Sequence, residues 1–196
     1  MGTEQKKFFS ENFMRYDEWY EEHGKEYRDQ IDFLKPLIPH GKGIEIGVGT
    51  GRFASALKIE YGVDYVREMV DESRKRGIKA IQADASELPF PDRFFDYSFS
   101  IVTMCFLDEP MAVLLESKRV AALVINVILD RDCEYIQNII RNPRGFYRYA
   151  TFYTEADLVE MYRKTGFSNI TVVRIDLQTL EGETYRLVVV SGRSGN

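Results

Sequence analysis

Hydrophobic residues along this chain fall into short runs, each broken by one or a few polar positions, that alternate with amphipathic stretches. The apolar runs, each the length of one buried strand, cover residues 43–47, 59–63, 78–81, 95–101 and 122–129. Between them, residues 52–58 and 66–76 follow helical spacing, and a further helix should begin near Glu109 and Pro110, since proline suits a first helical turn. Strands that alternate with helices predict a mostly parallel sheet covered on both faces.

The pattern changes towards the C-terminus. A helix should begin at Thr154 and end at Gly166. The threonine hydroxyl can cap the N-terminus of a helix, and acidic residues follow it in the first turn. Two β-rich runs follow, at 170–177 and 184–190, and the polar turn between them predicts a hairpin. We therefore expect a doubly wound α/β fold whose mostly parallel seven-stranded sheet ends in a C-terminal antiparallel hairpin. The tail at 191–196 should be frayed.

The N-terminal segment, residues 8–35, is predicted to be helical with a break near Gly24. Its aromatic side chains share one helical stripe: Phe13, Tyr16, Trp19 and Tyr20. Sequence ahead of the first strand can cross the sheet edge where ligands bind, so we expect residues 1–40 to form a helical lid over a core at 41–191. No repeat or linker divides the chain, and residues 1–196 are expected to form a single domain.

A glycine-rich loop follows the first strand. It reads Glu45-Ile46-Gly47-Val48-Gly49-Thr50-Gly51. Glycines at this place let the backbone pass close to a ligand. Asp64 ends the second strand about 17 positions after Gly47, near the spacing at which this fold places a ribose-binding acid. These features predict a nucleoside-binding site of some kind.

The glycine spacing separates the candidate ligands. A dinucleotide fold requires Gly-x-Gly-x-x-Gly, whereas this loop has Gly-x-Gly-x-Gly and places Arg52 where the third glycine should fall. Glu45 precedes the loop, and a carboxylate beside a pyrophosphate would be repelled, while one beside an ammonium group is favoured. The methionine part of S-adenosylmethionine carries such an ammonium group.

In these motifs the chain resembles the class I S-adenosylmethionine-dependent methyltransferases, whose fold is Rossmann-like. Besides the glycine block, Gln82-Ala83-Asp84-Ala85 is similar to the family's adenine loop. The run Tyr16-Asp17-Glu18-Trp19-Tyr20 resembles the small-molecule enzymes of ubiquinone and menaquinone biosynthesis. The resemblance implies that the cofactor is S-adenosylmethionine and that its contacts are Glu45, Gly47, Gly49, Gly51, Asp64, Tyr65, Met69, Asp84, Ala85 and Val102. Asp84 could instead cap the loop that follows it, and Met69 could be a core residue.

One feature departs from the family's pattern. The family usually has a Lys-Pro-Gly-Gly-like turn before its fifth strand. Here the predicted helix runs through Val120 directly into Ala121 and Ala122, so the turn is shortened and has no glycine.

Five residues are candidates for contact with the methyl acceptor: Tyr16, Trp19, Tyr20, Cys105 and Asp130. Each has an ordinary alternative, since the aromatic stripe could be core, a free cysteine is usually buried and inert, and Asp130 could lie in a solvated turn. A sulfonium methyl is already activated, and its transfer depends mainly on alignment and on exclusion of water. No acid–base group is therefore required, and the sequence singles out no catalytic residue.

Charge and composition exclude several function classes. The 26 basic and 31 acidic residues give a formal net charge of −5, which disfavours nucleic acid as a substrate. The densest basic run, Arg74-Lys75-Arg76, closes a predicted helix, where cations suit the helix dipole. His23, His40 and the two cysteines have no metal-ligand spacing, so no metal is expected. No apolar run approaches the ~20 residues of a membrane span, and the polar N-terminus has no signal-peptide pattern, which favours a cytoplasmic protein.

The sequence therefore predicts a methyltransferase that acts on a small molecule, with an amine or a phenol preferred as the acceptor. A binding protein that holds the nucleoside without chemistry is an alternative. A nicotinamide-dependent oxidoreductase is a weaker one, because the third glycine is misplaced.

Overall fold

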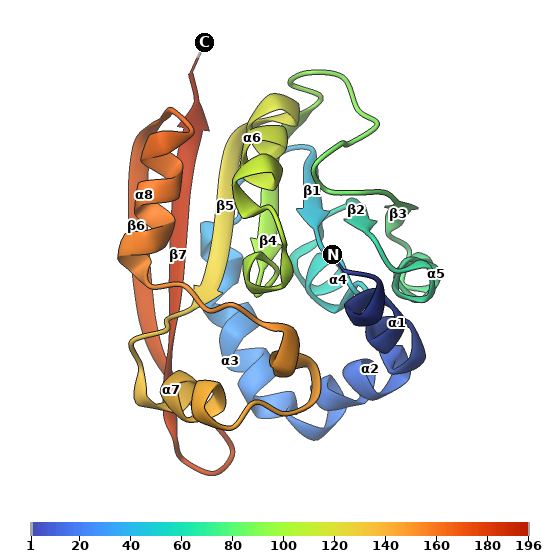
Figure 1. Cartoon of the computed structure of the whole chain (residues 1–196). Helices are drawn as coiled ribbons and strands as arrows, with labels where there is room; N and C mark the ends of the chain where they lie inside the picture. The colour runs from blue at the N-terminus through green and yellow to red at the C-terminus, as the bar shows by residue number, and fades with distance from the viewer. Residues whose placement is uncertain (1, 196) are drawn as a thin grey trace.

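A computed structural model describes residues 2–195, which form a single seven-stranded sheet with the order β3-β2-β1-β4-β5-β7-β6 (Figure 1). The strands are β1 (Gly43–Ile46), β2 (Tyr61–Asp64), β3 (Lys79–Gln82), β4 (Phe95–Ile101), β5 (Ala121–Leu129), β6 (Phe167–Gln178) and β7 (Thr184–Ser194). Strands β1 to β5 are parallel, and β7 pairs antiparallel with both β5 and β6. The predicted Rossmann-like fold, with its C-terminal hairpin, is confirmed.

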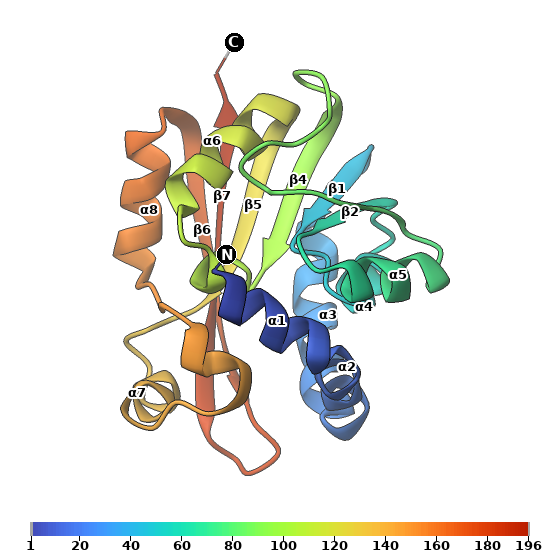
Figure 2. The same ribbon diagram turned by 45° about the vertical axis from the view of Figure 1, so that its right-hand side comes forward.

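Helices cover both faces of the sheet (Figure 2). The α-helices are α1 (Thr3–Glu11), α2 (Phe13–Glu22), α3 (Gly24–Leu34), α4 (Arg52–Leu57), α5 (Arg67–Lys75), α6 (Pro110–Val120), α7 (Glu134–Arg141) and α8 (Glu155–Lys164). Three short 3-10 helices connect them: η1 (Lys35–Leu37), η2 (Met104–Phe106) and η3 (Gly145–Tyr149). Helices α3, α4, α5 and α7 contribute to the core on one face, whereas α6 and α8 pack on the other.

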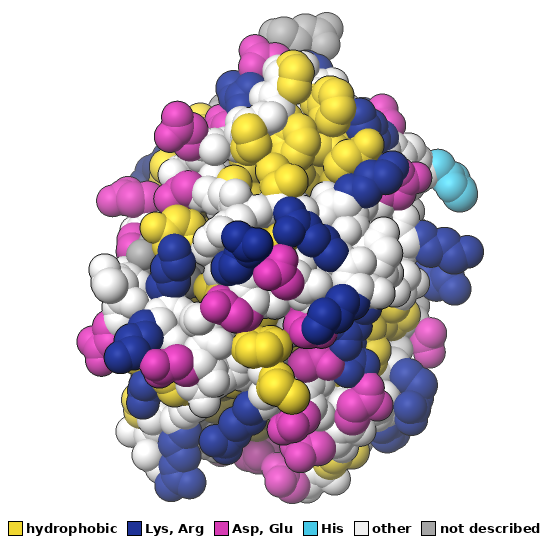
Figure 3. All heavy atoms as spheres, turned by 90° about the vertical axis from the view of Figure 1, so that its right-hand side faces the viewer, with side chains coloured by type: hydrophobic (Ala, Val, Ile, Leu, Met, Phe, Trp, Pro, Cys, Tyr) yellow, Lys and Arg dark blue, Asp and Glu magenta, His cyan; other side chains and the backbone are white. Residues whose placement is uncertain are grey.

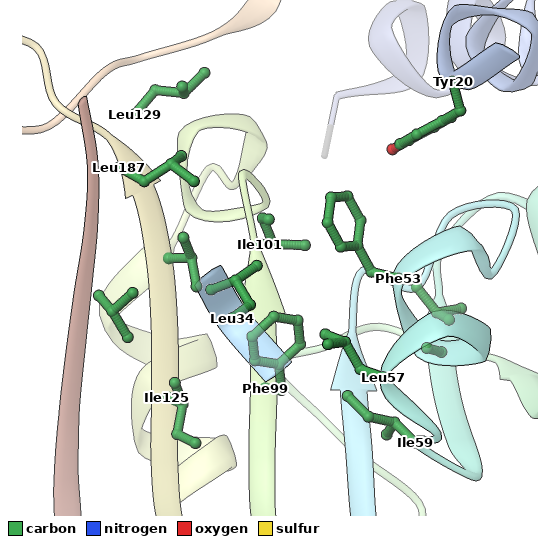
Figure 4. Close-up of a cluster of buried hydrophobic side chains, with 14 of the residues drawn as sticks. Tyr20, Leu34, Phe53, Leu57, Ile59, Phe99, Ile101, Ile125, Leu129 and Leu187 are labelled. Carbon is green, nitrogen blue, oxygen red and sulfur yellow. The ribbon is translucent and has the colours of Figure 1, made fainter. Parts of the chain in front are cut away.

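Alternation along the central strands divides the core between these two faces. Phe99 and Ile101 of β4 pack with Ile125 of β5 on the face of α3 and α4 (Figure 4). Val124 and Ile128 of β5 point the other way and pack against α6 and α8. Each such side chain stabilises the fold by about 1.5–3 kcal/mol when fully buried. Packing on both faces holds the sheet in place, so the residues at its carboxyl edge have fixed positions from which to form a ligand site.

The structure corrects several expected elements. The N-terminal segment is three helices, with a break at Asn12 in addition to the one near Gly24. Helices α7 and η3 were not predicted at all. The tail is not frayed, because β7 continues to Ser194, whose buried hydroxyl lies 2.7 Å from the Ala121 carbonyl oxygen. Asn196 lies outside the described residues.

The shortened turn before β5 is confirmed, since α6 ends at Val120 and β5 begins at Ala121 with no residue between them. Arg119, in the last turn of α6, holds the neighbouring β3–β4 connection in place. Its guanidinium donates to Glu116, to Asp92 and to the carbonyl oxygens of Leu88 and Phe90. The long connection between β3 and β4 is thus fixed to the helix that abuts β5.

A buried hydrogen-bond network joins α8 to the sheet and gives a stability prediction. Tyr162 is fully buried, and its hydroxyl donates to the side-chain oxygen of Asn126 at 2.6 Å. Tyr162→Phe should lower the free energy of unfolding by about 1–3 kcal/mol, because the Asn126 oxygen would lose its donor. Denaturant unfolding measures this change. An unchanged midpoint and slope would show that the network does not contribute.

Candidate functional site

The candidate site is a pocket at the carboxyl ends of β1, β2, β3 and β4. Its wall is formed by Phe9, Tyr16, Gly47, Gly49, Val63, Asp64, Tyr65, Val66, Met69, Ala83, Asp84, Ala85, Ile101, Val102, Thr103, Phe106 and Leu107. The pocket is open to solvent, and the space that the centre of a water-sized molecule can occupy in it is about 90 Å³. Ligands of open α/β sheets bind at this edge.

The glycine loop requires glycine for steric reasons that the structure makes explicit. Gly47 and Gly49 both have positive φ, at 71° and 52°, which side chains other than glycine rarely adopt. A Cβ on Gly47 would lie 2.4 Å from the Thr103 side chain, and one on Gly49 would lie 3.3 Å from the Tyr16 ring. The loop backbone is therefore packed between β4 and α2, with no room for side chains at these positions.

Asp64 lies beside the glycine loop and helps to hold it. Its two carboxylate oxygens accept hydrogen bonds from the backbone N–H groups of Gly49 and Val66, each at 2.9 Å. Burial raises the pKa of Asp64 and outweighs the opposite effect of these backbone donors. A carboxylate has about four lone-pair sites, so Asp64 keeps acceptor capacity for the hydroxyl groups of a ribose in the pocket.

Glu45 is the most unusual charged residue near the site. It is 2% exposed, and its Oε2 has no hydrogen-bond partner among the described residues. Burial raises the pKa of Glu45 well above its usual range, although the Ala54 backbone N–H opposes this. An unpaired buried carboxylate is costly. A cationic group that reached Oε2 would remove that cost, and the ammonium of a methionine moiety has the required charge.

The residues predicted to bind adenine follow β3. Asp84 and Ala85 line the pocket there, and Tyr65 and Met69 from the β2–α5 region also line it. Asp84 Oδ1 also accepts hydrogen bonds from the backbone N–H of Ser86 at 2.9 Å and from its hydroxyl at 2.7 Å. These bonds are the loop cap that the sequence offered as an alternative role, and they lower the pKa of Asp84. The cap fixes the carboxylate at the pocket wall without using all of its acceptor sites.

The backbone is strained where β4 enters the pocket. Val102 has φ of 50°, which is a costly conformation for a β-branched residue. Its N–H donates to the Val127 carbonyl oxygen at 2.9 Å, and the hydroxyl of Thr103 lies 3.2 Å from the Ile46 carbonyl oxygen. Neighbouring strands therefore enforce the turn. Strain of this kind concentrates at functional sites, and here it places both residues in the pocket wall.

The N-terminal helices cross the carboxyl edge and close one side of the pocket. Figure 2 shows α1 and α2 beyond the arrowheads of β1 and β4. Phe9 of α1 and Tyr16 of α2 line the pocket, and the Gln5 side chain donates to the Phe106 carbonyl oxygen at 3.0 Å. Phe146 of η3 packs on Phe9 and Tyr16, with ring centroids 4.9 and 5.5 Å away. Two distant parts of the chain thus meet over the site.

The structure brings together most of the predicted cofactor contacts. Of the ten, eight line the pocket, while Glu45 and Gly51 are not among its wall residues. Of the five acceptor candidates, Tyr16 alone is in the wall. The others lie apart from it: Trp19 packs at the edge of the core, Tyr20 is buried against Phe53 (Figure 4), Cys105 is buried, and Asp130 is buried beside Arg186.

Several residues of the pocket wall were not predicted from the sequence, among them Phe9, Thr103, Phe106 and Leu107. Phe106 and Leu107 follow β4 at the ligand-binding edge, so their position along the chain was a usable signal. Phe9 gave none, because its place in the wall depends on how α1 crosses the sheet.

Comparison with known proteins decides the family. A family model described as a methyltransferase domain matches residues 44–122. An uncharacterized protein of Methanocaldococcus jannaschii is 38% identical over 161 residues, which cover 79% of this chain and 78% of that protein. The crystal structure of an S-adenosylmethionine-dependent methyltransferase from Thermotoga maritima, described as a possible histamine N-methyltransferase, is 31% identical. It superimposes with a TM-score of 0.89 and covers 97% of this chain and 100% of the other.

The chain belongs to the S-adenosylmethionine-dependent methyltransferases. A more distant structure has the same fold: magnesium protoporphyrin IX methyltransferase from Synechocystis with bound SAH is 15% identical, with a TM-score of 0.74 over 96% of this chain and 98% of that one. The residues of this methyltransferase fit the family's cofactor in charge and shape. Among the described residues Glu45 Oε2 has no hydrogen-bond partner, and Gly47 and Gly49 bring the loop backbone, without side chains, to the pocket wall. Among residues 2–195, no helix is long and apolar enough to cross a membrane.

Proposed function

We propose that this methyltransferase acts on a small amine. The observation that carries the proposal is the aromatic part of the pocket lining, the rings of Phe9, Tyr16, Tyr65 and Phe106. Asp64 and Asp84, the charged side chains of that lining among the described residues, would be engaged by the cofactor. Aromatic faces attract cations, so an amine would bind here in its ammonium form. It would lose one proton to water before its nitrogen lone pair attacks the methyl carbon, and the C–S bond of the sulfonium breaks to release S-adenosylhomocysteine. The description of the Thermotoga maritima relative as a possible histamine N-methyltransferase supports the same acceptor class.

Two further features support a small acceptor over a macromolecule. The Tyr16–Tyr20 run resembles the methyltransferases of ubiquinone and menaquinone biosynthesis. On the face drawn in Figure 3, basic side chains are interspersed with acidic ones, whereas nucleic-acid binding needs lysine and arginine gathered together.

The pocket residues would divide the work as follows. Asp64 would accept from the ribose hydroxyls, Asp84 and the Ala85 backbone would hold the adenine, and Glu45 would face the ammonium group. The bound cofactor supplies an activated methyl group on a sulfonium sulfur. What remains for the chain is to align the acceptor and to exclude water. We propose that α1 and α2 form the lid that does this, with Phe9 and Tyr16 as its inner surface.

Asp64→Ala tests the cofactor site. Loss of hydrogen bonds to a charged acceptor costs about 1.5–3 kcal/mol, so affinity for S-adenosylhomocysteine should fall roughly tenfold to a hundredfold. Titration calorimetry measures it, and Asp92→Ala, which removes an exposed acid away from the pocket, is the control. Equal affinity for the wild type and Asp64→Ala would show that Asp64 does not bind the ribose.

A panel of acceptors tests the reaction. Transfer of a labelled methyl group from S-adenosylmethionine should be detected with amines such as histamine, and not with carboxylic acids of similar size. If the protein binds the cofactor and methylates only phenols or acids, the amine proposal is wrong. If it binds the cofactor and methylates nothing in a broad panel, the alternative of a binding protein without chemistry is favoured.

A further inference from the structure

Two arginines near the cofactor loop have no part in the proposed function. Arg52 follows Gly51, where a dinucleotide-binding loop would have its third glycine, and Arg76 follows the last turn of α5. Neither belongs to the wall of the pocket. Both guanidinium groups instead turn towards α2 and meet at Asp17.

The contacts of Asp17 are close and geometrically specific. Its Oδ1 accepts from Nε of Arg52 at 2.9 Å, and its Oδ2 accepts from Nη2 of Arg52 at 2.6 Å and from Nη2 of Arg76 at 2.8 Å. The three side chains are only 19–24% exposed. A bidentate, partly buried arginine–carboxylate pair is stronger than an ordinary surface pair. Glu21 also accepts from Arg52, at 2.5 Å, but is 72% exposed.

The same cluster holds the cofactor loop. Nη1 of Arg76 donates to the Thr50 carbonyl oxygen at 2.8 Å, and the Arg52 carbonyl oxygen accepts from the Tyr27 hydroxyl at 2.7 Å. Arg52 itself begins α4 directly after the loop. Asp17 therefore ties α2 to both ends of the segment 50–52.

Asp17 is adjacent in sequence to the residue of α2 that lines the pocket. The Tyr16 ring packs against Gly49, and its hydroxyl lies 2.9 Å from the hydroxyl of Tyr20, one turn further along α2. Any change in the rotation or height of α2 at Asp17 must move Tyr16 relative to the loop.

We propose that Asp17 is a positioning residue that latches α2 to the cofactor loop through Arg52 and Arg76, and thereby holds Tyr16 over the bound cofactor. This inference rests on the proposed function, since it assigns the latch to the same site. Without Asp17, two cations would face each other with only exposed Glu21 between α2 and Arg52. The lid would then open more often, and the cofactor product would leave faster.

The chain contains its own reporter for this motion. Trp19 is the one tryptophan of the sequence, lies on α2 two residues after Asp17, and stacks on His23. Its fluorescence at fixed pH can follow both the exposure of α2 and the release of S-adenosylhomocysteine.

Asp17→Asn should raise the dissociation rate of S-adenosylhomocysteine about tenfold, as expected for the loss of a charge-assisted hydrogen bond. Salt screens a partly buried ion pair less than an exposed one, so the wild-type rate should rise modestly between roughly 50 and 500 mM NaCl, while the rate for Asp17→Asn should stay nearly flat. Asp29→Asn is the matched control, because Asp29 pairs with Lys25 on α3 and has no contact with the loop. The control should behave as the wild type.

A wild-type rate or an unchanged salt dependence in Asp17→Asn would overturn the latch. If that variant fails to fold, Arg52→Lys, which keeps the charge but loses the bidentate geometry, should show an intermediate rate, and a wild-type rate would overturn the proposal. If the wild type does not bind S-adenosylhomocysteine, the cofactor assignment fails first. In that case acrylamide quenching of Trp19 fluorescence in the ligand-free proteins still tests the latch. Greater quenching in Asp17→Asn than in Asp29→Asn would support the latch, and equal quenching would contradict it.

Discussion

Glu45→Gln is expected to weaken S-adenosylhomocysteine binding about a hundredfold while making the ligand-free protein more stable. The substitution removes the charge that would face the ammonium group of the ligand, and loss of such a buried, charge-assisted contact costs about 3 kcal/mol. In the ligand-free chain the same charge is a burden, because the buried Oε2 has no partner. Sites that bind ligands often carry such a cost in the free protein.

The stability of the ligand-free protein should also depend on pH through the Glu45 carboxyl group. Burial raises the pKa of Glu45, so its contribution to stability is fully present below the pKa of the unfolded chain and is lost as the pH rises through the raised pKa of the folded protein. The ligand-free wild type should therefore lose stability relative to Glu45→Gln towards neutral pH. For a chain of this length each 1 kcal/mol shifts the melting temperature by about 2–4 °C.

Calorimetry and thermal unfolding measure the two effects of Glu45→Gln on samples of one preparation. Glu60→Gln is the control, since Glu60, directly before β2, is exposed and pairs with Lys79 of β3. Wild-type affinity in Glu45→Gln would mean that Glu45 is a structural residue of the loop and does not contact the ligand.

Deletion of residues 1–22 should abolish methyl transfer and leave a weakened but measurable affinity for S-adenosylhomocysteine. The deletion removes Phe9 and Tyr16 from the pocket wall, so water enters and the acceptor loses one side of its site. It also removes buried Tyr20 from the core, which lowers stability by about 1.5–3 kcal/mol for that side chain. The remaining chain keeps the whole sheet and should fold.

Circular dichroism, calorimetry and methyl-transfer assays separate the possible outcomes of this truncation. Met14→Ala, at the most exposed large hydrophobic side chain of α2, should leave all three measurements unchanged. A truncated chain that folds and retains full turnover would show that α1 and α2 do not act as a lid. A truncated chain that unfolds would show that these helices are part of the hydrophobic core that the fold requires.

The sheet could be predicted from the sequence because each of its strands is a local pattern. The runs at 43–47 and 95–101 are rich in apolar residues, and their spacing with the intervening helices leaves few arrangements of the strands. The β7 tail was missed because its last residues are polar. Ser194 and its neighbours are ordered by pairing with β6 and by contact with Ala121, which are partners more than 20 residues away.

The candidate site, too, has parts that the sequence could predict and parts that it could not. The glycine loop and Asp64 were found because their spacing is fixed by one β-α-β unit. The aromatic stripe of α2 could not be resolved further, since Tyr16 and Tyr20 share a helical face yet one lines the pocket and the other is buried against Phe53. The basic run at 74–76 was interpreted as a helix end. Arg76 has a second role through Asp17 and Thr50 that only the tertiary structure brings together.

A crystal structure of the full chain with S-adenosylhomocysteine is the most direct test of the proposed cofactor site. We predict electron density for the ligand in the pocket, with the ribose hydroxyls within hydrogen-bond distance of Asp64, the adenine beside Asp84 and Ala85, and the amino nitrogen on the side of Glu45. Density at another place on the sheet, or a ligand in this pocket whose ribose and amino group contact neither carboxylate, would contradict the account.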